Sequence, residues 1–151
     1  MQSQKCTRMS NMDYDQTKNS TEIIDHGNGI KCTIKIESGS KYEIWTKDDK
    51  KHRDNDLPAH IRYHDNDDGV FIVHQYWYTD GKINRSNDKP AVIHYSKHEV
   101  KESESWFLDD KNCRTDLSKP ITIEYNDEDG TTEEWYISNI NCTKHYFVQD
   151  N

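Results

Sequence analysis

Tryptophan recurs in this chain at a nearly constant spacing of 29 to 32 residues, and other residue types recur with it. In three copies an arginine, a proline and a tyrosine follow the tryptophan in the same order, and the fourth copy has Thr143 in the arginine's place. A fixed period of roughly 20–50 residues is the signature of a repeat architecture. We interpret the repeated positions as structural: Trp45, Trp77, Trp106, Trp135, Arg53, Arg85, Arg114, Pro58, Pro90, Pro120, Tyr63, Tyr95 and Tyr125.

Each copy contains two segments that read as β-strands. The segment after the proline, such as 90–95, has apolar residues on one face and mostly polar residues on the other, and this period of two is typical of a half-buried strand. The second segment carries the tryptophan, as in 71–78. Because short turns join successive strands, the strands are antiparallel neighbours. The sequence therefore predicts an all-β fold, an antiparallel β-meander of about four hairpin repeats in one open sheet.

A tight turn ends the second segment, most clearly at Asp80-Gly81. Asp49, Asp110 and Asn139 stand in the glycine's place, and Asp and Asn tolerate left-handed backbone geometry better than most residues, so the same turn is predicted in all four copies. The loop after the turn holds an arginine and an aspartate. We interpret them as a salt bridge within that loop, with the arginine placed to stack on the tryptophan. The pairs are Arg53 with Asp56, Arg85 with Asp88, and Arg114 with Asp116.

The pattern divides the chain into a non-repeat N-terminal segment, 1–22, and a repeat domain, 23–151, with units near 31–57, 58–89, 90–119 and 120–151. Residues 32–36 and 145–148 are predicted to form the two edges of the sheet. An open edge strand can pair with another chain. The edge strands and residues 1–22 are therefore candidate routes to a homodimer.

Acidic residues outnumber basic ones by 28 to 20, which gives a net charge of −8. This balance argues against a nucleic-acid partner, because nucleic-acid binders normally show a basic face. No apolar stretch is long enough to span a bilayer, and the first twenty residues lack the apolar centre of a signal peptide. We therefore expect a cytoplasmic protein whose four cysteines are free thiols: Cys6, Cys32, Cys113 and Cys142.

The best-preserved copy resembles a known repeat family. It reads Trp77, Tyr78, Asp80, Gly81 and Lys82, followed by Arg85, Asp88, Pro90, Ala91, Ile93 and Tyr95. This pattern resembles MORN-type repeats, and more closely a MORN-variant repeat common in proteins of giant DNA viruses of amoebae. The resemblance covers about residues 40–148. It implies a viral repeat protein, located in the host cytoplasm or the virion, with a viral or host protein as its partner.

The sequence contains no motif that indicates a metal site, a catalytic site or a phosphate-binding site. No cysteine or histidine spacing fits a metal site, and the Asp-rich turns at 64–69 and 125–130 lack oxygen ligands at the end positions of a calcium loop. His60 and His94 are predicted on polar strand faces in different columns of the repeat, so the imidazoles are not expected to converge. A candidate nucleophile such as Cys113 has no nearby histidine base within its own copy, and no phosphate-binding loop is present. We predict no catalytic residues, no metal and no cofactor.

The tryptophans themselves allow two interpretations. They are either a buried column that joins successive hairpins or an exposed aromatic stripe for a partner. We favour the buried column because of the large apolar area of the indole ring.

The sequence thus favours a non-catalytic repeat scaffold for protein–protein interaction or self-association. A ligand-binding module or enzyme that uses a groove in a curved sheet is the alternative. Nucleic-acid association through the column of repeated arginines, Arg53, Arg85 and Arg114, is a second and weaker alternative.

Overall fold

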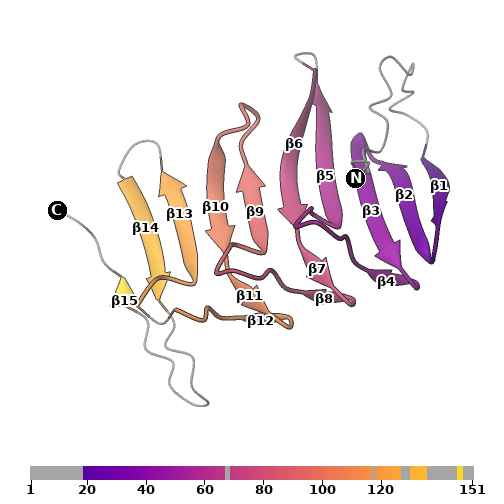
Figure 1. Ribbon diagram of the computed structural model, residues 1–151. Coiled ribbons are helices and arrows are strands. Elements are labelled where there is room, and N and C mark those ends of the chain that lie inside the picture. The colour runs from indigo at the N-terminus through magenta and orange to yellow at the C-terminus, as the bar shows by residue number, and fades with distance from the viewer. Residues whose placement is uncertain (1–18, 67–68, 117, 127–129, 136–145, 148–151) are drawn as a thin grey trace.

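The computed structural model describes residues 19–66, 69–116, 118–126, 130–135 and 146–147. In these ranges every regular element is a β-strand, and neighbouring strands of the main sheet run antiparallel. Figure 1 shows the strands side by side in one sheet that does not close on itself. The predicted all-β fold of consecutive hairpins in an open antiparallel sheet is confirmed.

The main sheet contains most of the strands, and the short ones lie beside its lower end (Figure 1). Its order is β1 (Ser20–Gly27), β2 (Ile30–Glu37), β3 (Ser40–Lys47), β5 (His60–Asn66), β6 (Gly69–Tyr76), β9 (Val92–Tyr95), β10 (Lys101–Ser105), β13 (Thr122–Asn126), β14 (Gly130–Trp135) and β15 (Tyr146–Phe147). The short strand β4 (Lys50–Lys51) pairs with the end of β3. Two separate small hairpins are β7 (Tyr78–Thr79) with β8 (Lys82–Ile83), and β11 (Phe107–Leu108) with β12 (Lys111–Asn112).

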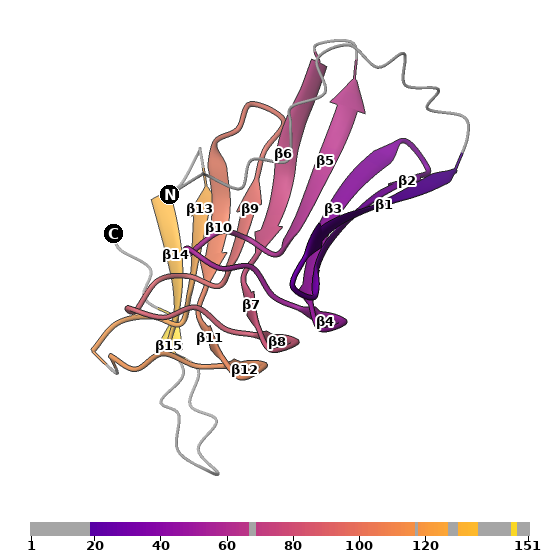
Figure 2. The same cartoon turned by 45° about the vertical axis from the view of Figure 1, so that its right-hand side comes forward.

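The tryptophan interrupts the strand that was predicted to run through it. β6 ends at Tyr76 and β7 begins at Tyr78, so the single strand predicted over 71–78 is two strands. The Trp77 N–H donates to the Ala91 carbonyl at 2.8 Å, and the Trp77 carbonyl accepts from the Asn84 N–H at 3.1 Å. These bonds turn the chain from the long hairpin into the short one, which leaves the lower end of the sheet in Figure 2.

The turns of the short hairpins have the left-handed geometry that the sequence predicted. Gly81 has a φ of 87°, and Asp49 and Asp110 in the glycine's place have φ values of 60° and 67°. Asn139, the fourth predicted turn residue, lies outside the described residues.

One edge of the sheet differs from the prediction. β1 is the outermost strand, and it begins at Ser20, inside the predicted non-repeat segment 1–22. Residues 32–36 belong to β2, which pairs with β1 on one side and β3 on the other, so their assignment to an edge is wrong. β15 at the opposite edge falls within the predicted last strand, 145–148.

The core consists of small clusters, one beside the next along the sheet. Trp45 packs with Cys32 and Ala59, and Tyr78 from the following hairpin contacts this cluster. Trp77 packs in the same way with Ala91 and Ile93, and Phe107 contacts that second cluster. The residues after Trp77 and Trp106 therefore reach back to the preceding cluster. A chain that is only 31% hydrophobic can build such a core because each cluster needs few apolar residues.

Candidate functional site

One face of the sheet carries the repeated residues. Trp45, Trp77 and Trp106 are 0%, 7% and 6% exposed, so these three indoles are core residues and do not form an exposed stripe. An arginine stacks on each ring, with the guanidinium carbon 3.8 to 4.1 Å from the ring centre. Each of these arginines also donates to the carbonyl of the repeated proline, at 2.9 to 3.2 Å. The side chain of Trp135 and the residue Thr143 lie outside the described part of the structure.

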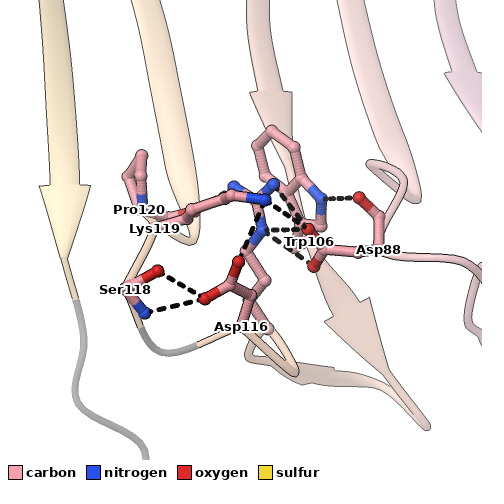
Figure 3. Close-up of polar contacts among 7 residues, drawn as sticks. Asp88, Trp106, Asp116, Ser118, Lys119 and Pro120 are labelled. Carbon is pink, nitrogen blue, oxygen red and sulfur yellow. Dashed lines mark hydrogen bonds and ion pairs between the residues drawn. The ribbon is translucent and has the colours of Figure 1, made fainter.

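The arginine is paired with an aspartate, but this aspartate lies in the preceding loop. Arg114 makes two hydrogen bonds of 2.8 Å to the two oxygens of Asp88, and the Trp106 indole N–H donates to the Asp88 carbonyl at 3.0 Å (Figure 3). Arg85 and Trp77 contact Asp56 in the same way. The predicted bridges within one loop are therefore wrong. Stacked hairpins bring the loop of one beside the arginine of the next.

We name the stacked pairs Arg85–Asp56 and Arg114–Asp88, with Arg53 and Asp116 at the two ends, the arginine ladder. The contacts at its two ends differ from those within the pairs. The Arg53 N–H lies 3.3 Å from a Glu43 oxygen that also accepts from the Trp45 indole at 2.5 Å. Asp116, at the other end, accepts hydrogen bonds from Ser118 and pairs with Lys119 at 2.9 Å (Figure 3). Glu43 thus takes the aspartate's role for Arg53, and Ser118 and Lys119 occupy the Asp116 carboxylate, which has no arginine partner among the described residues.

The repeated tyrosines are bonded to the strand beside them. Their hydroxyls donate to the side chain two residues before each tryptophan, and the distances are 3.2, 2.9 and 2.7 Å. The pairs are Tyr63 with Glu43, Tyr95 with Gln75, and Tyr125 with Glu104. Every repeated side chain that the structure describes on this face thus has a partner within the fold.

The ladder lowers the pKa of its carboxyl groups. Hydrogen bonds from Arg85 lower the pKa of Asp56 to about 2, and the bonds from Arg114 lower the pKa of Asp88. Both aspartates are therefore ionised at neutral pH and hold the guanidinium groups as ion pairs.

We predict that the Arg114–Asp88 pair couples neighbouring hairpins. In a double-mutant cycle of Arg114→Gln and Asp88→Asn, the coupling free energy measured by urea unfolding should be about 1–3 kcal/mol, because the bonds are bidentate and the Arg114 side chain is 8% exposed. The matched exposed pair Lys35–Glu37 should give at most about 0.5 kcal/mol. Equal values for the two pairs would contradict the structural role of the ladder.

The opposite face does not repeat. Two rows of directly paired residues cross it, and in each row the residue type changes from hairpin to hairpin. One row is Ile44, His60, Tyr76, Val92, Ser105 and Thr122. The other is Tyr42, Arg62, His74, His94, Ser103 and Glu124. The rings are concentrated on β3, β5, β6 and β9, and hydroxyl groups replace them on β10.

Six residues of these rows form a continuous half-buried cluster, which we name the imidazole–tyrosine surface: Tyr42, His60, Arg62, His74, Tyr76 and His94. The His74 and His94 rings lie 4.4 Å apart, and His60 stacks on Tyr76 at 5.3 Å. His60 and His94 lie in different rows, as expected from their different columns in the repeat. The contact that the sequence analysis missed is the one between His74 and His94, which are not equivalent positions of the repeat but pair across neighbouring strands.

The imidazoles of this surface are held neutral at pH 7. Burial, and after it the charges of Lys51 and His74, lower the pKa of His60 to about 4. Burial and then His94 and Arg62 lower the pKa of His74 to about 4. The His60 Nε2 and the Arg62 Nε are buried and have no hydrogen-bond partner among the described residues.

Other chemistry finds little support in the described residues. They contain no group of three His, Cys, Asp or Glu side chains that could hold a metal ion, and no helix suited to crossing a membrane. Of their cysteines, Cys113 is a free thiol. A groove of about 330 Å³ lies between the 85–89 loop and β11, but its arginines, Arg85 and Arg114, are already bound to aspartates.

Comparisons of the chain with protein-family models, with curated proteins and with solved structures find no match. The resemblance to MORN-type repeats therefore stays a prediction.

Proposed function

We propose that the chain is a non-catalytic scaffold that binds a partner protein through the imidazole–tyrosine surface. The observation that carries this proposal is a difference between the two faces of the sheet: one face has repeated residues and the other does not. On the face with the tryptophans, the described repeated side chains bond to one another or to the backbone. On the other face, the residues vary from hairpin to hairpin although the backbone does not require it.

The chemistry of the surface supports a protein as the partner. Tyrosine, histidine and arginine combine apolar area with hydrogen-bonding groups, and tyrosine and arginine are enriched at protein interfaces. The surface lies on an open sheet face, where strands hold its rings in place. A small-molecule site would be a concave pocket with converging polar groups. The imidazole–tyrosine surface does not line the groove of the described part, which lies near β11.

Photo-crosslinking in the source cell tests the proposal. A photoreactive amino acid at Tyr42 should form an adduct with one discrete protein, which mass spectrometry identifies. The same probe at Lys82, an exposed residue of a short hairpin, is the control and should not form this adduct.

A matched variant shows whether the surface itself is responsible. His74→Ser and Tyr76→Ser introduce the residues that β10 already carries at the equivalent positions, Ser103 and Ser105, so the fold should accept them. The adduct at Tyr42 should disappear in this double variant. An adduct that persists, or that forms equally at Lys82, would contradict the proposal.

A further inference from the structure

We propose that the imidazole–tyrosine surface recognises an acidic peptide segment of its partner, with a carboxylate of that segment bound at Arg62. This inference rests on the proposed function and adds the chemistry of the partner. It follows from the charges on this face.

Arg62 lacks the carboxylate partner that the other described arginines have. Arg85 and Arg114 bind aspartates, and Arg53 lies 3.3 Å from a Glu43 oxygen. Arg62 donates to the Ser40 hydroxyl at 3.2 Å and lies 5.8 Å from the centre of the Tyr42 ring. Among the described residues no carboxylate lies within salt-bridge distance of it. A half-buried guanidinium that has lost part of its water is a strong site for an anion.

The surroundings of Arg62 are cationic although the chain is acidic. Lys51, which acts on His60, lies over the Tyr78 ring at 4.8 Å and has no carboxylate partner in the described part of the chain. Two of the acidic groups on β2 and the β3–β4 turn are already paired, because Glu37 pairs with Lys35 and Asp49 pairs with Lys31. Among the described residues, the acidic group that acts on these imidazoles is Glu102, beside His94. An incoming carboxylate would therefore meet attraction here.

The charge of the whole chain selects a short acidic peptide over a nucleic acid. With a net charge of −8, most of the molecule repels a long polyanion. Two cations without acidic partners, Lys51 and Arg62, suit one or two carboxylates. The tyrosine and histidine rings around them provide area for the apolar parts of a peptide, and the Tyr42 and Tyr76 hydroxyls provide hydrogen bonds.

A carboxylate bound at Arg62 should change the pKa values of the neutral imidazoles beside it. His60 and His74 are neutral at pH 7, because burial first, and then Lys51, Arg62 and their histidine neighbours, disfavour protonation. A carboxylate bound beside them would oppose these cations and raise both pKa values. Binding should then take up protons and become tighter as the pH falls from 7 toward 5.

NMR titration with a blocked hexaglutamate peptide at low ionic strength tests the inference. The peptide should shift the Arg62 Nε–H signal and the imidazole signals of His60 and His74, and the pKa values of both histidines should rise. The Arg62→Gln variant should bind the peptide at least about tenfold more weakly, because a charge-assisted hydrogen bond is lost. The control Lys111→Gln removes an exposed charge on β12, in the next short hairpin along the sheet, and should change the affinity by less than about twofold.

Three further probes separate this inference from its competitors. A blocked hexaglutamine peptide should not bind, and equal binding of it would show that the carboxylates are irrelevant. Inorganic phosphate or single-stranded oligothymidylate that shifts Arg62 where hexaglutamate does not would overturn the acidic-peptide assignment. If the Tyr42 crosslink survives in the Arg62→Gln variant and hexaglutamate does not bind, this inference fails while the proposed scaffold function stands.

Discussion

Replacing Trp77 by alanine should lower the free energy of unfolding by about 3–5 kcal/mol, which is the usual cost of removing a large buried aromatic side chain. The ring is 7% exposed and packs against Ala91 and Ile93. It also stacks on Arg85 at 3.8 Å and donates from its indole nitrogen to the Asp56 carbonyl at 3.0 Å. The substitution therefore removes contacts within one hairpin and contacts to the preceding one. Urea unfolding followed by circular dichroism measures the loss.

Trp77→Phe is the matched control. Phenylalanine retains an aromatic ring but has no N–H for the Asp56 carbonyl, so the cost should be smaller, about 1–2 kcal/mol. This variant also keeps the prediction testable if Trp77→Ala does not fold. A loss below about 1 kcal/mol for Trp77→Ala would show that the tryptophan does not hold neighbouring hairpins together.

Local features of this fold could be predicted because they depend on neighbouring residues in the chain. The alternation of residues 90–95 reflects the two faces of a strand, and the Asp80-Gly81 turn reflects the left-handed backbone that glycine accepts. The burial of Trp77 follows from the large apolar area of its ring, which few other residues of this chain could replace.

Contacts between hairpins could not be predicted in the same way. Arg85 is three residues from Asp88 but binds Asp56, 29 residues away, because the stacking of hairpins decides which loop faces the guanidinium. His74 and His94 meet because strand register pairs them, and register is not visible in a list of equivalent repeat positions. Strand β1 was missed because its residues carry neither the proline nor the tryptophan of the repeat.

Lowering the pH from 7 to 5 should lower the free energy of unfolding by about 2–3 kcal/mol through His60 and His74, a figure reduced for the solvent screening of these half-buried rings. Burial lowers the pKa of both histidines to about 4 in the folded protein, whereas the ordinary value is 6.5. The unfolded chain therefore binds more protons than the folded one between pH 6.5 and about 4, and stability falls as the pH falls through this window. The aspartates of the arginine ladder do not act in this window, because their contribution is lost below their ordinary pKa of 3.8.

The double variant His60→Gln/His74→Gln tests this origin of the pH dependence. Glutamine does not titrate, so urea unfolding at pH 7 and pH 5 should give nearly the same free energy for the variant, apart from the smaller contribution of His94, whose pKa burial also lowers. His98→Gln is the matched control, because His98 lies in the exposed turn between β9 and β10 and its loss should leave the full pH dependence. A double variant that loses as much stability at pH 5 as the native chain would show that the imidazole–tyrosine surface does not exclude protons. The half-buried packing of its rings would then not describe the protein in solution, and the proton uptake expected when an acidic peptide binds would lose its basis.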